Sequence, residues 1–78
     1  MIRLKDIKRE NDCISAKYFP EGQNEWGFIK IGNDKKWIEG RKSAYDEDMD
    51  VYFYKAKREL ERLLKEENIP SERIIMWY

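Results

Sequence analysis

Hydrophobic and polar residues alternate with a period of two along the first half of the chain, which predicts a series of β-strands. The predicted strands are Ile2–Arg9, Cys13–Phe19, Glu25–Ile31 and a short segment at Trp37–Glu39. Turn-forming residues separate them, and Glu10-Asn11-Asp12 predicts a tight hairpin between the first two strands. The alternation fails at Asp6-Ile7, so we expect a bulge or a strand end there. The spacing of the strands indicates an antiparallel meander.

The second half of the chain changes to a helical period. Apolar residues recur at intervals of three and four between Asp48 and Glu67, which predicts an amphipathic helix. Its apolar face contains Met49, Phe53, Ala56, Leu60, Leu63 and Leu64, with Tyr52 beside them. Asp48 or Asp50 can cap the first turn, and the helix must end before Pro70. The run Ile74–Tyr78 combines high β-propensity with low charge, which predicts a last strand paired within the sheet.

This order of elements predicts an α+β fold, β-β-β-(β)-α-β, in two layers, with one amphipathic helix packed on a mainly antiparallel sheet. The length of 78 residues predicts a single domain spanning residues 1–78. We expect the core to contain Leu4, Ile14, Ala16, Phe28 or Ile29, Ile31, Phe53, Ala56, Leu60, Leu64, Ile74 and Met76. A register change of one residue in the third strand would exchange Trp26 and Phe28 for Ile29 and Ile31.

Two of the predicted strands are apolar on both faces, although a helix covers only one face of a sheet. In the third strand Trp26 and Phe28 oppose Ile29 and Ile31, and the last strand alternates in the same way. Either both strands are central and covered by long neighbouring side chains, or a second apolar surface exists that contacts a subunit, a protein or a ligand. The candidate interface residues are Trp26, Phe28, Trp37 and Trp77. We expect Trp26 or Trp77 to lie partly exposed in an apolar patch.

Composition excludes several classes of site. There is no histidine, and Cys13 is the only cysteine, so neither an intramolecular disulfide nor a Cys/His metal framework can form. Sixteen basic residues balance sixteen acidic ones, which argues against a strongly basic nucleic-acid-binding protein. No signal peptide or long apolar stretch is present, so we expect a cytoplasmic protein without a membrane span.

Few residues offer catalytic or ligand-binding chemistry. The carboxylates of residues 46–50 can bind Ca²⁺ or Mg²⁺, but they lack the spacing of an EF-hand loop, and their acidity suits a helix N-terminus. Cys13 lacks a histidine partner and fits a half-buried position in a strand. Gly27 lies inside a strand, which indicates a bulge or a close approach of another group. We therefore expect no enzyme activity, no catalytic residue, no metal and no cofactor.

The function predicted from these features is a non-enzymatic protein-interaction module or a homodimer. The alternative is a weak nucleic-acid-binding module that uses basic residues interleaved with aromatic ones. These residues are Lys17-Tyr18-Phe19, Lys30, Lys35-Lys36-Trp37 and Arg41-Lys42. The ending Ile69–Tyr78 after a Lys/Glu/Leu-rich helix, and the Tyr18–Gly22 turn, resemble segments of small uncharacterised bacterial proteins. The resemblance implies a bacterial cytoplasmic origin and supplies no activity, ligand or catalytic residue.

Overall fold

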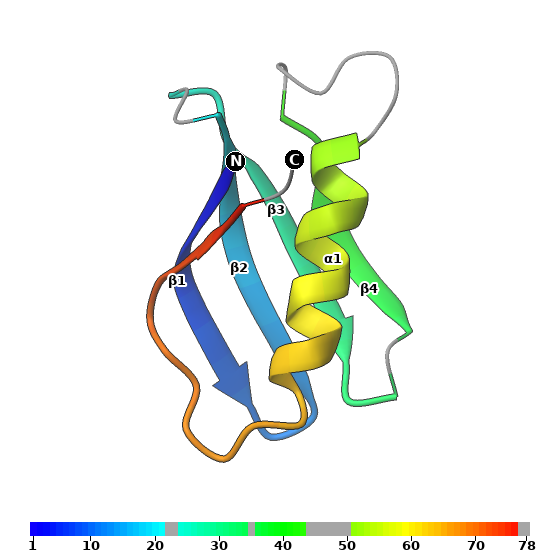
Figure 1. Cartoon of the computed structure of the whole chain (residues 1–78). Coiled ribbons are helices and arrows are strands. Elements are labelled where there is room, and N and C mark those ends of the chain that lie inside the picture. Colours follow the sequence, from blue (N-terminus) through cyan, green and yellow to red (C-terminus); the bar gives the residue numbers. More distant parts are fainter. Residues whose placement is uncertain (22–23, 35, 44–50, 77–78) are drawn as a thin grey trace.

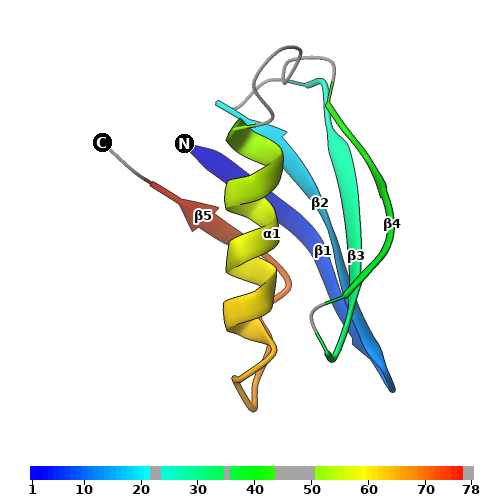
Figure 2. The ribbon, with the colours of Figure 1, turned by 90° about the vertical axis from the view of Figure 1, so that its right-hand side faces the viewer.

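The computed structural model of the chain describes residues 1–21, 24–34, 36–43 and 51–76, with Trp37 described by its backbone alone. Its elements are β1 (Ile2–Glu10), β2 (Cys13–Pro20), β3 (Gly27–Gly32), β4 (Trp37–Arg41), α1 (Val51–Leu63) and β5 (Arg73–Ile75). Within these ranges the strands form a five-stranded antiparallel sheet of order β4-β3-β2-β1-β5 (Figure 1). The helix packs across one face of the sheet (Figure 2). The predicted α+β fold is confirmed.

The core lies between α1 and the inward face of the three central strands. Cross-strand pairing aligns Leu4 with Tyr18, Ala16 with Ile29 and Ile14 with Ile31, so inward residues form continuous rows. The helix adds four buried side chains: Phe53, Ala56, Leu60 and Leu63. Among the inward residues of the sheet, Ile2, Leu4, Ile14, Tyr18 and Ile31 are fully buried, and Ile29 is nearly so. The alternation predicted for the first two strands therefore selects the correct face, and in the third strand, where the sequence allows either Phe28 or Ile29, Ile29 and Ile31 lie in the core and Phe28 lies on the opposite face.

The irregularity expected at Asp6-Ile7 is a β-bulge. The register between β1 and β2 shifts between Lys5 and Lys8, and Asp6 has a φ of 53°. The extra residue restores the alternation, so that Ile7 is buried beside Leu4 on the helix side. Asp6 tolerates this left-handed conformation better than most residues because its short polar side chain can hydrogen-bond locally.

Gly27 marks a close approach of a buried side chain, one of the two alternatives predicted for it. A Cβ atom at this position would lie 2.2 Å from Cε1 of Tyr18 and 2.6 Å from the carbonyl oxygen of Arg41. The Tyr18 hydroxyl accepts a hydrogen bond of 2.8 Å from the backbone N–H of Ser43, and its ring meets Phe53 edge-on at 6.0 Å. Tyr18 therefore holds the end of β4 against the core.

The helix ends four residues earlier than the predicted Glu67. After Leu63 the chain tightens, since the N–H of Glu66 donates to a carbonyl three positions back. The guanidinium of Arg9 donates hydrogen bonds of 2.8 Å to the carbonyl oxygens of Leu64 and Glu66. These carbonyls lie past the last helical hydrogen bonds, so Arg9 stabilises the C-terminal end of α1 from the neighbouring strand.

The cap expected at Asp48 or Asp50, and the core position expected for Met49, lie outside the described residues.

The last strand turns toward the core the face opposite to the predicted one. Ile74 and Met76 were expected in the core, but they are 50% and 60% exposed. The prediction is wrong because β5 pairs Ile75 with Ile2, which turns Ile75 toward the helix side and Ile74 away from it. Tyr78 and Trp77 lie outside the described residues.

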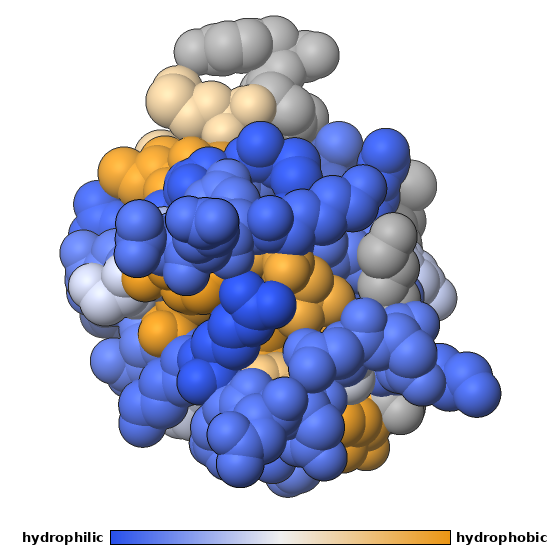
Figure 3. Space-filling view, turned by 90° about the horizontal axis from the view of Figure 1, so that it is seen from below, coloured by the Kyte–Doolittle hydropathy of each residue, from blue (hydrophilic) through white to orange (hydrophobic). Residues whose placement is uncertain are grey.

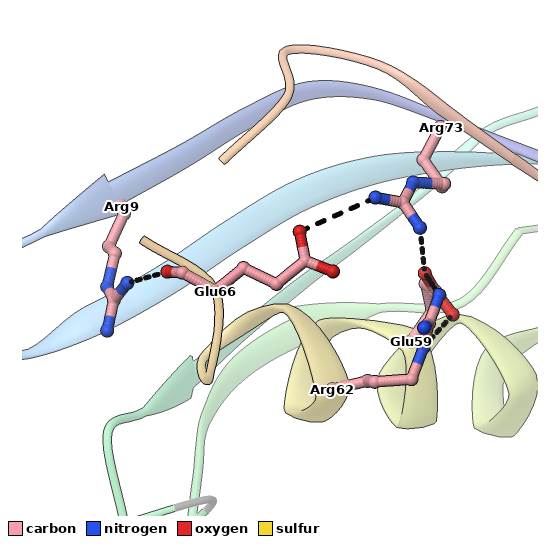
Figure 4. Close-up of polar contacts among 5 residues, drawn as sticks. All are labelled: Arg9, Glu59, Arg62, Glu66 and Arg73. Carbon is pink, nitrogen blue, oxygen red and sulfur yellow. Dashed lines mark hydrogen bonds and ion pairs between the residues drawn. The ribbon is translucent and has the colours of Figure 1, made fainter. Parts of the chain in front are cut away.

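An ion-pair network holds β5 to the helix (Figure 4). Arg73 of β5 donates to the carboxylate of Glu59 at 3.2 Å and lies 3.6 Å from that of Glu66. Glu59 also accepts hydrogen bonds from Arg62, and this contact raises the pKa of the Arg62 guanidinium above its ordinary value. The side chain of Glu59 is only 11% exposed, so the network attaches β5 to the side of α1 nearest to it.

The end of the molecule that carries the β1–β2 turn is less completely closed. Leu64 and Ile69 pack against the core but stay partly exposed. Seen from below, apolar surface shows between charged side chains (Figure 3). No helix in the described ranges is long and apolar enough to cross a membrane.

Candidate functional site

The most distinctive surface is the face of the sheet opposite α1, which we call the open face. Residues on it alternate with buried ones, and no helix of the described ranges lies over it. Its basic residues are Arg3, Lys5, Lys8, Lys17, Lys30 and Arg41, and its acidic residues are Asp6, Glu10 and Glu39. Half-buried aromatic rings of Phe19, Trp26 and Phe28 lie between them. The open face is therefore basic and aromatic.

Cation–π contacts organise this surface. The ammonium of Lys17 lies 4.7 Å from the ring centre of Trp26, and the guanidinium of Arg41 lies 4.2 Å from it. Arg41 also donates a hydrogen bond of 3.4 Å to the carbonyl oxygen of Trp26. Lys5 lies 5.3 Å from the ring centre of Phe19. Such contacts stabilise exposed sites by about 0.5–1 kcal/mol each, so they hold the side chains in place without locking them.

Cross-strand register brings these groups together from separate parts of the sequence. Lys17 of β2 pairs with Lys5 of β1 on one side and with Phe28 of β3 on the other, and Phe28 pairs with Arg41 of β4. One row across the sheet therefore reads Lys5, Lys17, Phe28 and Arg41. In a neighbouring row Ser15 lies between longer side chains of adjacent strands.

A hollow of about 290 Å³ opens on this face, beside the β1 bulge. It is lined by Asp6, Lys8, Glu10, Ser15, Lys17, Phe28, Lys30 and Glu39. Ser15 has the smallest of these side chains and lies between Lys8 and Lys30 in the register, which explains the depression above it. At its edge the bulge brings Asp6 to 3.4 Å from the ammonium of Lys17.

A second hollow lies between α1 and β5 and has a volume of about 260 Å³. It is lined by Lys55, Arg58, Glu59, Arg62 and Ile75. Glu59 is already bound by Arg62 and by Arg73, so part of its charge serves to attach β5. The open face offers the larger set of cations and rings, and we take it as the candidate functional site.

Of the four candidate interface residues, the structure describes the side chains of two. Trp26 and Phe28 are half-buried and lie together on the open face, as a shared interface requires. The side chain of Trp37 is not described, and Trp77 lies outside the described residues. The ring of Trp26 is partly exposed but lies under the cations of Lys17 and Arg41 rather than in an apolar patch, and the alternative position of that patch, at Trp77, stays a prediction.

The predicted set of basic and aromatic residues also needs correction. Tyr18 belongs to the Lys17-Tyr18-Phe19 run but is fully buried, because successive strand residues point to opposite faces. Arg3 and Lys5 were absent from that set, although they alternate with Ile2 and Leu4 and therefore point away from the core. The alternation along β1 carried enough information to find them.

Among the described residues, no group of three or more His, Cys, Asp and Glu side chains is placed to hold a metal ion. The acidic segment 46–50 lies outside those residues. Cys13 is buried at the start of β2. Comparison with protein-family models, with curated proteins and with solved structures found no match to this chain. Any functional assignment therefore rests on the geometry of the open face.

Proposed function

We propose that this domain is a non-catalytic binding module whose open face binds single-stranded nucleic acid. The observation that carries the proposal is the pairing of cations with aromatic rings, Lys5 with Phe19 and both Lys17 and Arg41 with Trp26. Single strands are bound by cations that meet the phosphates and by rings on which bases stack. An antiparallel sheet with its helix behind it leaves one face available for such stacking.

The formal neutrality of the chain does not oppose this proposal, because the charges are sorted in space. The sequence contains sixteen basic and sixteen acidic residues, yet basic side chains predominate on the open face. A ligand near that face experiences the local field, which controls encounter with a polyanion more than net charge does.

Binding requires that the cations leave the rings over which they lie. Each exposed cation–π contact is worth about 0.5–1 kcal/mol, whereas a base stacked on an aromatic side chain is worth about 1–3 kcal/mol. A nucleotide can supply both replacements, since its phosphate takes the ammonium of Lys5 and its base takes the ring of Phe19. The exchange is therefore favourable for a ligand that carries both groups.

The test measures binding of a fluorescently labelled, mixed-sequence single-stranded oligonucleotide by anisotropy across a salt series. We expect affinity to fall linearly on a log–log plot of salt, and Lys5→Ala to lower the slope by about one. Phe19→Ala should weaken binding by about 1–3 kcal/mol, because one stacking platform is lost. The matched control is Lys65→Ala, an exposed lysine beyond the end of α1, which should leave the slope unchanged.

Two results would contradict the proposal. One is an absence of binding even at low salt. The other is equal affinity for polyglutamate, a polyanion without bases, since aromatic stacking would then contribute nothing. An acidic protein as the partner would give that second result.

A separate observation favours self-association as a second candidate function. Ile74 and Met76 are half-exposed or more at β5, which is an edge strand of the sheet. Exposed apolar residues on an edge strand favour pairing with another strand, here that of a second copy. Sedimentation equilibrium should show a dimer that Ile74→Glu dissociates; a monomer at every concentration would contradict it.

We also propose a cytoplasmic location. A reducing compartment suits a chain of this size whose only cysteine, Cys13, is buried. Formation of a disulfide-linked dimer during expression in a reducing cytoplasm would contradict this assignment.

A further inference from the structure

We propose that the hollow beside the β1 bulge is a base-specific pocket that selects guanine. This inference rests on the proposed binding of single-stranded nucleic acid and adds to it a preference for one base. The carboxylate of Asp6 and the ammonium of Lys17, 3.4 Å apart at the edge of the hollow, form the reading edge.

The order of donors and acceptors points to guanine. An ammonium beside a carboxylate presents one donor followed by two acceptor oxygens. This is the order on the Watson–Crick edge of cytosine, which carries an amino group, a ring nitrogen and a carbonyl oxygen. The complement is the edge of guanine, where the O6 acceptor is followed by the N1–H and N2–H donors. Lys17 can then donate to O6 while Asp6 accepts from N1–H and N2–H.

The other bases satisfy this pair less well. Adenine has no carbonyl on its Watson–Crick edge, and its single amino group cannot engage both carboxylate oxygens. Cytosine can turn an acceptor toward Lys17 and its amino group toward Asp6, but that edge offers one donor and so leaves the second carboxylate oxygen without a partner. Uracil and thymine offer one N–H between two carbonyl oxygens, so one oxygen would face the Asp6 carboxylate. Only guanine places an acceptor at Lys17 and two adjacent donors at Asp6.

The surroundings of the pair suit a flat ring. Phe28 lines the same hollow and is half-buried, so it offers a surface for stacking beside the reading edge. The small side chain of Ser15 leaves space for the base in the hollow, and Ser15 lies between Lys8 and Lys30 in the register. These lysines can meet phosphates on either side of a bound nucleotide.

The backbone at Asp6 supports a binding role. Its φ of 53° is in the left-handed region, which a non-glycine residue occupies only at an energetic cost. Such strained residues cluster at binding sites, where they aim a side chain that regular structure would misplace. Here the bulge turns the Asp6 carboxylate toward Lys17, one strand away.

The experiment uses thymidine oligonucleotides that differ only at one central base, with binding measured by fluorescence anisotropy. Guanine at that position should bind about tenfold more tightly than adenine or cytosine, as expected for a bidentate base contact. Hypoxanthine, which lacks the 2-amino group, should lose most of this advantage. The variant Asp6→Asn keeps a residue that tolerates positive φ but replaces one acceptor oxygen with a donor, so it should abolish the preference.

The matched control is Glu39→Gln, which removes another carboxylate that lines the same hollow. It should keep the guanine preference. Equal affinity for the oligonucleotides with guanine, adenine, cytosine and hypoxanthine at the central position would contradict the guanine-selective pocket and leave the proposed nucleic-acid binding intact. If none of them binds, the proposed function is refuted as well. Loss of the preference in Glu39→Gln but not in Asp6→Asn would overturn the assignment of Asp6.

Discussion

Gly27→Ala tests the packing that supports the open face from behind. The added methyl group would lie 2.2 Å and 2.5 Å from two ring atoms of Tyr18 and 2.6 Å from the backbone oxygen of Arg41. Ordinary carbon contacts begin near 3.5 Å, so the ring or the β4 backbone must move by about 1 Å. Tyr18 is fully buried and cannot swing into solvent. Overpacking of this kind costs about 1–3 kcal/mol.

A second cost arises if the Tyr18 ring moves away from Ser43. The backbone N–H of this buried serine would lose the hydroxyl that accepts its hydrogen bond at 2.8 Å. Weakening a buried hydrogen bond costs about 1 kcal/mol, so the total for Gly27→Ala is about 2–4 kcal/mol. That loss is a large fraction of the stability of a small domain.

Urea denaturation followed by far-ultraviolet circular dichroism measures this loss. The matched control is Gly32→Ala, where the nearest atom to the new Cβ is a carboxylate oxygen of the exposed Asp34 and the next lies at 3.7 Å. That exposed side chain can rotate away at the cost of the hydrogen bond that it accepts from the backbone N–H of Lys36, so we expect a smaller loss than for Gly27→Ala. A Gly27→Ala midpoint equal to that of Gly32→Ala would refute the packing argument. Adding Tyr18→Leu should recover part of the loss, as a coupled pair requires.

Three further substitutions probe other contacts. Tyr18→Phe removes only the hydroxyl and should cost about 1–3 kcal/mol in urea denaturation, because the N–H of Ser43 loses this acceptor; an unchanged midpoint would contradict it. Leu60→Ala deletes a fully buried side chain of α1 and should cost about 2–5 kcal/mol in the same assay, whereas a loss below about 0.5 kcal/mol would place Leu60 at the surface. The pKa of Glu21 lies below its ordinary value of 4.5 because its carboxylate accepts hydrogen bonds from the α-ammonium group of Met1 and from the Tyr52 hydroxyl. A lowered carboxylate pKa stabilises the folded state above the unfolded pKa and loses this effect as the pH falls through the folded pKa, so the melting-temperature advantage over Glu21→Gln should shrink below pH 4.5. An advantage independent of pH would refute this linkage.

Much of the fold could be predicted because several strands and the helix have unambiguous periods. The alternation in residues 13–19 identifies the inward face of β2, and the helical spacing identifies Phe53 and Leu60 as core residues. In β3 both faces are apolar, so the choice of Ile29 over Phe28 comes from the structure. The last strand could not be predicted in the same way. Ile74, Ile75 and Met76 are consecutive apolar residues, so the sequence contains no alternation that selects one face. The register with Ile2 makes the selection, and this register is a property of the assembled sheet.

The open face depends on pairing between strands, which explains why only part of it could be predicted. Lys17 and Arg41 are far apart in the sequence, and both meet Trp26 only because β2, β3 and β4 are neighbours in register. Hydrophobic patterning specifies the buried side of each strand, and the opposite side is left to the residues that remain. When those residues are mostly Lys and Arg, as Arg3, Lys5 and Lys8 are in β1, a neutral chain acquires a basic surface.

The β1 bulge is the point at which fold and surface depend on one residue. In an unbroken strand the alternation that buries Leu4 would bury Asp6 and Lys8 as well and would turn Ile7 to solvent. Burying an unpaired charge costs far more than a strained backbone, so the bulge at Asp6 is the more stable solution. The same step keeps Lys8 on the open face and brings the carboxylate of Asp6 beside Lys17. The β1 bulge that keeps Asp6 and Lys8 out of the core therefore also forms the proposed pocket.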